Sequence, residues 1–126
     1  MTVLVAYNES PQGDAAFAAA VQEATRRKVS LTVLVLTPQP NDAPVPSRLA
    51  ALISSSGKEV EVAFRSDRID VADAILDHAE QADTDMIVLG SRKRTPVGKF
   101  LLGSTTQRVL LDASVPVLVV KADSAE

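Results

Sequence analysis

Two glycines frame the part of the sequence best suited to bind an anion. Gly90 follows the apolar run 86–89, whose length and composition are typical of a buried strand that Gly90 ends. Gly103 precedes Ser104 and Thr105 at the start of a helical pattern. A polar loop between the glycines would leave the carboxyl end of a strand and enter the amino end of a helix. Free backbone N–H groups and the helix dipole make such a place an anion site, above all for phosphate.

Basic residues are concentrated in the same loop, which spans 90–105. They are Arg92, Lys93, Arg94 and Lys99. Positive charge beside a phosphate site favours binding, but a run of charge is also typical of a solvated loop. The other candidates have structural interpretations too. Gly90 can simply end a strand, and Ser104 and Thr105 can cap the helix that follows.

The rest of the sequence offers little for catalysis. It contains no cysteine, no G-x-S-x-G motif and no recognisable histidine–carboxylate pair. His78, the only histidine, lies on an apolar helical stripe and is expected at the edge of the core. Asp67, Asp70 and Asp73 span a helix start, so capping explains them better than a metal does. A phosphate site without a general base predicts binding or very slow hydrolysis, and we expect no enzyme.

Composition limits the class of protein. At 126 residues the chain is long enough for one domain, 1–126, with one core. Hydrophobic residues make up 46% and charged residues 23%, which is a globular mixture. The net charge of −3 argues against a nucleic-acid partner. No apolar run is long enough to span a membrane and the N-terminus lacks a signal-peptide pattern, so we expect a cytoplasmic protein with no membrane partner.

Strand and helix patterns alternate along the whole chain. Apolar or alternating runs predict strands at 2–7, 30–37, 58–64, 86–89 and 117–120. Helical spacing predicts helices at about 11–28, 47–56, 70–82 and 104–113. Such an alternation predicts an α/β fold with a parallel sheet covered on both faces. The run at 58–64 has one polar face, which is typical of a strand at the edge of a sheet.

Cap residues support the predicted helix ends. Ser10 is suited to be the N-cap of the first helix, with Pro11 at its first helical position. Ser47 and Asp70 are expected to cap the second and third helices. Gly57 is suited to end the second helix because it tolerates the left-handed conformation.

Two stretches closely resemble the universal stress protein family. They are VLVAYNESPQGDAAF near the N-terminus and GSRKRTPVGKFLLGSTTQRVLLDASVPVLVVK near the C-terminus. With the alternation between them, the resemblance covers nearly the whole chain. It implies a Rossmann-like three-layer α/β/α fold with a five-stranded parallel sheet of order 3-2-1-4-5. It also implies homodimers and, in one of the two broad family groups, a bound adenine nucleotide, ATP or AMP, with or without Mg²⁺.

The resemblance also implies which residues would bind the nucleotide. They are Ala6, Tyr7, Asn8, Val35, Gly90, Ser91, Arg92, Lys93, Gly103, Ser104 and Thr105. Two positions depart from the family signature. Lys93 replaces a glycine, losing conformational freedom but adding an ammonium that can bind phosphate. Asn8 replaces an aspartate, which keeps hydrogen bonding but weakens metal coordination. These departures leave open a dimeric interaction module that binds no nucleotide.

The last predicted strand bears on assembly. In a 3-2-1-4-5 sheet it is an edge strand, and an apolar edge leaves backbone hydrogen-bonding groups unpaired. We therefore expect a C₂ homodimer in which this strand pairs with its own copy, antiparallel. The interface residues would be Val117, Leu118, Val119 and Val120. The family resemblance thus implies a dimeric stress-response regulatory protein.

Overall fold

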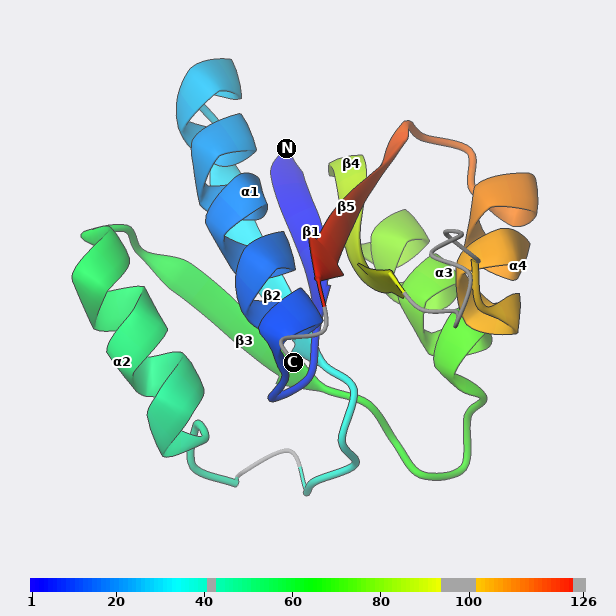
Figure 1. The fold of residues 1–126 in the computed structure, drawn as a ribbon, viewed down its shortest axis with the longest axis horizontal. Coiled ribbons are helices and arrows are strands. Elements are labelled where there is room, and N and C mark those ends of the chain that lie inside the picture. Colours follow the sequence, from blue (N-terminus) through cyan, green and yellow to red (C-terminus); the bar gives the residue numbers. More distant parts are fainter. Residues whose placement is uncertain (41–42, 94–101, 124–126) are drawn as a thin grey trace.

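The fold alternates strands and helices from end to end. The computed structural model describes residues 1–40, 43–93 and 102–123. Its elements are β1 (Thr2–Tyr7), α1 (Pro11–Arg27), β2 (Ser30–Val35), α2 (Ser47–Ser56), β3 (Val60–Phe64), α3 (Val71–Gln81), β4 (Thr84–Lys93), α4 (Ser104–Asp112) and β5 (Val117–Asp123). The strands form one parallel sheet of order β3-β2-β1-β4-β5, which confirms the predicted topology (Figure 1).

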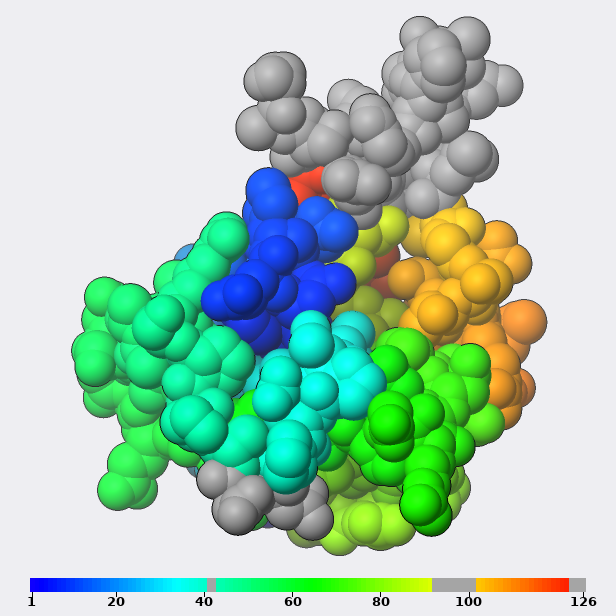
Figure 2. Space-filling model, turned by 90° about the horizontal axis from the view of Figure 1, so that it is seen from below, coloured from blue at the N-terminus to red at the C-terminus, as the bar shows by residue number. Residues whose placement is uncertain are grey.

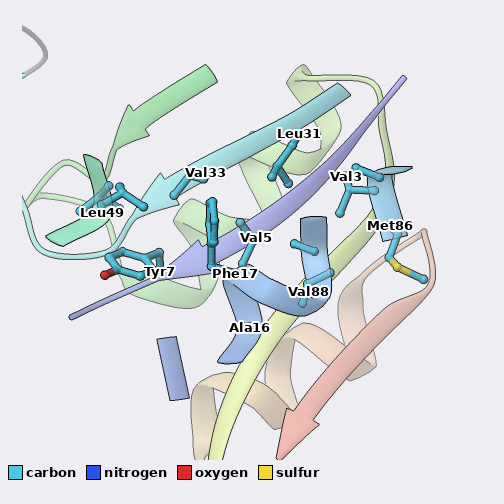
Figure 3. Close-up of a cluster of buried hydrophobic side chains, with 13 residues drawn as sticks. Val3, Val5, Tyr7, Ala16, Phe17, Leu31, Val33, Leu49, Met86 and Val88 are labelled. Carbon is cyan, nitrogen blue, oxygen red and sulfur yellow. The ribbon is translucent and has the colours of Figure 1, made fainter. Parts of the chain in front are cut away.

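The sheet is covered by two helices on each face (Figure 1). Alternate residues of β1 point to opposite faces, as strand geometry requires. Val3, Val5 and Tyr7 pack against α1 and α2, where Phe17 and Leu49 contribute large side chains (Figure 3). The opposite face is a second cluster, built around Leu4, Ala6, Leu34, Ile75, Ile87 and Val109. A mainly aliphatic core therefore fixes each helix layer on the sheet.

Local capping explains where three of the helices begin or end. The Ser10 hydroxyl accepts a hydrogen bond from the Gly13 N–H at 3.0 Å, and Pro11 follows as the first helical residue. The Asp70 carboxylate accepts one from Ala72 N–H at 3.1 Å. Gly57 ends α2 with a φ of 68°, in the left-handed region. These predictions are confirmed.

Two predictions about element boundaries are wrong. The N-cap of α2 is Pro46, and Ser47 is the first helical residue without a capping hydrogen bond. Gly90 does not end β4, because β5 continues the ladder beside it. Gly90 pairs with Val120, and the strand runs on to Lys93. The first positions of the loop predicted at 90–105 therefore belong to β4, and its positions 94–101, with Arg94 and Lys99, lie outside the described residues.

The two edges of the sheet are β3 and β5, as predicted. On β3, Val60, Val62 and Phe64 pack toward α1 and α2, while Ala63 packs on the other face. No helix among the described residues is long and apolar enough to cross a membrane.

Candidate functional site

A cavity of about 490 Å³ opens at the carboxyl ends of the central strands. Figure 2 looks onto this end of the sheet, where residues 8–13, residues 36–40, the start of α3 and the start of α4 surround a hollow. The lining residues are Ala6, Asn8, Gln12, Gly13, Leu36, Thr37, Pro38, Arg65, Val71, Ile75, Leu89, Gly90, Thr105 and Thr106. Ligands of open parallel sheets bind at this position, outside the carboxyl ends of the strands.

The cavity has an apolar base and a polar rim. Ala6 of β1 and Leu89 of β4, with Val71 and Ile75 from α3, supply aliphatic surface. The rim carries amide, hydroxyl and guanidinium groups from Asn8, Gln12, Thr37, Arg65, Thr105 and Thr106. Apolar walls with a few placed polar groups are typical of sites for small organic ligands.

The amino end of α4 opens on the cavity. Its N-cap is Gly103, which has no side chain to accept a capping hydrogen bond. Thr105 and Thr106, in the first turn, line the cavity, and Thr106 is buried. The first N–H groups of a helix have no partner within it, and they carry the positive end of its dipole. Ser104 and Thr105 are thus helical residues rather than caps, and the helix start can accept an anion.

Gly90 is required by close packing. A Cβ at Gly90 would lie 2.2 Å from the backbone oxygen of Gln12. Gly13 has the same constraint, since a Cβ there would lie 1.9 Å from the backbone oxygen of Asn8. The first turn of α1 therefore touches both the end of β1 and the backbone of β4. Gly90 has this packing role whether or not a phosphate binds beside it.

Asn8 is engaged by its own turn. Its Oδ1 accepts a hydrogen bond from the Ser10 hydroxyl at 2.6 Å. Gln12, which the sequence did not single out, also lines the cavity, and its Oε1 is buried with no hydrogen-bond partner among the described residues. Asn8, which stands where the family has aspartate, thus already uses its amide oxygen in a hydrogen bond.

Arg65 is a second lining residue that sequence reasoning missed. Its backbone N–H donates to Val35 O at 3.0 Å, and its Nε donates to Leu36 O at 2.8 Å. Its Nη1 donates to Ile69 O at 2.7 Å and Ser66 O at 3.3 Å. The guanidinium therefore ties the end of β2 to the loop before α3. A cation directly after a strand end is a signal that could have identified it.

Several expected site residues lie outside the cavity lining. Tyr7 and Val35 are buried in the opposite core, under α1 and α2. The Tyr7 hydroxyl donates to Asp14 Oδ1 at 3.4 Å, and Asp14 also pairs with Arg48. Burial, with the nearby Asp14 carboxylate, raises the pKa of Tyr7 to about 12. Leu36, which follows Val35 in the sequence, lines the cavity instead.

The remaining expected residues lie near the two ends of the loop. Ser91 is buried and, with Arg92 and Lys93, forms the last part of β4. Gly103 and Ser104 are exposed at the start of α4. The structure thus brings Ala6, Asn8, Gly90 and Thr105 together around one cavity.

Acidic residues near the site serve structural contacts. Asp70 and Asp73 both pair with Arg108 of α4, with Nη1 of Arg108 3.5 Å from the Asp70 carboxylate. These pairs join α4 to the start of α3. No group of three or more His, Cys, Asp or Glu residues in the described parts of the chain could hold a metal ion.

The β5 edge is made of aliphatic residues, whereas the cavity has a polar rim. Val117 to Val120 are half-buried. Leu118 and Val120 pack toward the α1 layer, and Val117 packs on the other face. One side of β5 pairs with β4, and the other is the outer edge of the sheet.

Comparisons with known proteins agree with this architecture. A model of the universal stress protein family matches residues 1–121. A universal stress protein of Mycolicibacterium smegmatis is 36% identical over 94% of this chain and 96% of its own length.

Solved structures give the same result. The universal stress protein from Archaeoglobus fulgidus superimposes with a TM-score of 0.80 at 29% identity, covering 96% of this chain and 98% of that one. A structure of the universal stress protein from the same organism in complex with dAMP shares the fold, with a TM-score of 0.75 at 24% identity and the same coverage. The chain therefore belongs to the universal stress protein family.

Proposed function

We propose that the cavity binds an adenine nucleotide, ATP or AMP, and that binding regulates a stress response without catalytic turnover. The observation that carries this proposal is the cavity itself, which joins the amino end of α4 to an apolar base at the strand ends. Family members have been crystallised with dAMP, cAMP and AMP, which supports an adenine nucleotide.

The chemistry of the lining suggests how the ligand would lie. Phosphates would meet the N–H groups at the start of α4 and the backbone near Gly90. The base would lie over the aliphatic surface, near Leu36 and the Arg65 guanidinium. The carbonyl of Val35 already accepts the Arg65 N–H, and both backbone groups of Leu36 are also engaged, by Tyr7 O and Arg65 Nε, so the backbone of Thr37 is better placed to read the base.

Magnesium would be held mainly by the nucleotide. Mg²⁺ retains several waters and commonly uses phosphate oxygens with few protein ligands. Asn8 offers a neutral oxygen rather than a carboxylate, and its Oδ1 already accepts from Ser10. We therefore expect binding of ATP to depend only weakly on Mg²⁺.

Calorimetry tests the proposal directly. ATP, AMP and adenosine would be titrated into the purified protein, with and without Mg²⁺. We expect saturable heat for both nucleotides and weaker binding of adenosine, which lacks the phosphate. The absence of heat at about 1 mM nucleotide, which corresponds to roughly 4 kcal/mol of binding, would refute it.

A second candidate function is an interaction module that binds no nucleotide. It is favoured by the surroundings of the two residues that depart from the nucleotide-binding signature. Lys93, where the family signature has glycine, lies within β4 in register with Asp123. The Oδ1 of Asn8 is engaged by Ser10. Mass spectrometry of ligand extracted from the purified protein distinguishes the candidates, because an adenine nucleotide would be recovered only in the first case.

We also propose that β5 forms a homodimer interface. The edge carries four consecutive aliphatic residues, Val117 to Val120, and an unpaired apolar edge is prone to associate. An antiparallel pairing of two copies would satisfy both edges and close on itself. Light scattering should then give about twice the 13.3 kDa mass of the chain. Val119→Pro removes a backbone donor and should give monomers or aggregates, whereas a wild-type monomer at micromolar concentration would contradict the proposal.

A further inference from the structure

Arg65 holds together two chain segments at the rim of the cavity. Its Nε donates a hydrogen bond to Leu36 O at 2.8 Å, after β2, and its Nη1 donates to Ile69 O at 2.7 Å, in the loop before α3. A longer bond joins Nη1 to Ser66 O at 3.3 Å. In Figure 2 the segment after β2, in cyan, lies beside the start of α3, in green. These three hydrogen bonds form what we call the Arg65 clasp.

The Arg65 clasp can persist when a ligand binds. The remaining guanidinium nitrogen, Nη2, has no hydrogen-bond partner in the described parts of the chain. It is not one of the buried unpaired atoms either, so it stays accessible on this half-buried side chain. Because Arg65 lines the cavity, a bound molecule can contact the guanidinium without displacing any of its bonds to the backbone.

The clasp lies far from the expected phosphate position. Arg65 directly follows β3, whereas the phosphates are expected at Gly90 of β4 and at the start of α4. The strand order puts β3 and β4 three strand positions apart. With about 4.8 Å between neighbouring strands, that separation is roughly 14 Å. Leu36, Thr37 and Pro38 line the cavity on the side of the clasp, where the base of a nucleotide would lie.

We infer that Arg65 is a positioning residue, whose clasp holds the segment 36–38 against the loop before α3 in the arrangement that admits the base. This inference rests on the proposed nucleotide function. Without the guanidinium, the carbonyls of Leu36 and Ile69 lose a charge-assisted partner, and the two segments are free to separate. A ligand then binds only those molecules in which the two segments are correctly placed, so its apparent affinity falls by that fraction.

Calorimetry with AMP and adenosine as probes tests the inference. Arg65→Met keeps an unbranched side chain but removes the clasp. We expect it to bind both probes about tenfold more weakly, as for a wall that is correctly formed in about a tenth of the molecules. The ratio of the two affinities, which reports the phosphate contact, should not change, because both probes carry the same base. Arg68→Met removes an exposed cation from the same loop, is the matched control and should bind like the wild type.

Arg65→Lys separates the clasp from simple charge. None of the ion pairs among the described residues includes Arg65, so its charge is available to attract phosphate through space. Lysine retains that charge, but a single ammonium lacks the planar fork that reaches both Leu36 O and Ile69 O. Arg65→Lys should therefore lose about as much AMP affinity as Arg65→Met, and it provides the test if Arg65→Met fails to fold. Wild-type AMP affinity in Arg65→Lys, or a loss confined to AMP in Arg65→Met, would show that only charge matters and overturn the inference.

Hydrogen exchange gives a readout other than affinity. The Ile69 N–H donates to Ser66 O at 3.2 Å, within the loop that the clasp holds. It should exchange faster in Arg65→Met than in the wild type, while the amides of β1 stay unchanged, and saturation with AMP should slow it again. Unchanged exchange, or wild-type affinity in Arg65→Met, would overturn the inference and leave the proposed function intact. If the wild type bound neither probe, both would be overturned.

Discussion

The contact between Gly90 and α1 gives the sharpest test of this structure. In Gly90→Ala the new methyl group would lie 2.2 Å from Gln12 O and 2.8 Å from Gln12 C. Real contacts of this kind are essentially never closer than 3.0 Å, so β4 and the first turn of α1 must separate. Neither side can yield by rotating a side chain, because both colliding groups belong to regular backbone. Backbone conformation is not the obstacle, since Gly90 has no positive φ.

The expected loss follows from the cost of overpacking. Adding a carbon atom to a packed core destabilises by about 1–3 kcal/mol, and a clash with backbone places this change at about 3 kcal/mol. For a chain of this length that loss lowers the melting temperature by roughly 10 °C. Urea denaturation and thermal unfolding of the ligand-free protein would measure it. Gly13→Ala should behave similarly, because its Cβ would lie 1.9 Å from Asn8 O.

Gly103→Ala is the matched control for this experiment. It makes the same chemical change at the other end of the predicted loop, where a Cβ would have nothing within 4 Å. With a φ of −71°, alanine fits there, so stability should stay within about 0.5 kcal/mol of the wild type. If Gly90→Ala were equally harmless, the close approach of α1 to β4 would be refuted. A variant with normal stability but weaker nucleotide binding would give Gly90 a phosphate role alone.

Three further changes test other parts of the molecule. If the Lys93 ammonium binds phosphate, Lys93→Ala should weaken the binding of ATP by about 1.5–3 kcal/mol and that of adenosine hardly at all, as measured by calorimetry. Tighter binding of ATP by Lys93→Gly would mean that the shape of the loop matters more than the charge. In the folded protein the pKa of Tyr7 is raised to about 12, so this phenol loses its proton at a lower pH in the unfolded chain. The free energy of unfolding should therefore fall as the pH rises from about 10 to 12. Tyr7→Phe should lack this part of the loss in urea titrations, and an unchanged alkaline slope would contradict it. Leu49→Ala should cost about 2–5 kcal/mol, because Leu49 is fully buried between α2 and the sheet, whereas Leu111→Ala, at an 82% exposed position, should cost little.

Local signals explain why the fold could be predicted from the sequence. The Ser10–Pro11 start of α1, the Asp70 cap of α3 and the left-handed Gly57 each depend on interactions within a few residues. The period of the apolar residues then assigned each segment to a strand or a helix. The strand order came from the family resemblance, and the structure confirmed it.

Features that depend on distant parts of the chain could not be predicted in the same way. The extension of β4 beyond Gly90 requires β5 as a partner, which local sequence does not reveal. The role of Arg65 depends on the carbonyls of Leu36 and Ile69, from two different loops. Tyr7 was expected at the site, but strand alternation turns its side chain into the opposite core, where the side chain of Val35, expected to act through its backbone, also lies.

The first turn of α1 takes part both in the packing of the fold and in the lining of the cavity. The strand order places β1 between β2 and β4, so the chain leaving β1 must pass over the carboxyl edge where the cavity opens. Ser10 caps α1 there and occupies the acceptor of Asn8, while glycines at positions 13 and 90 let the turn lie directly on the neighbouring backbone. The same close approach brings the Gln12 side chain to the wall of the cavity. Moving α1 away from β4 should therefore weaken both the fold and ligand binding in the cavity, because the same turn packs on β4 and lines the cavity.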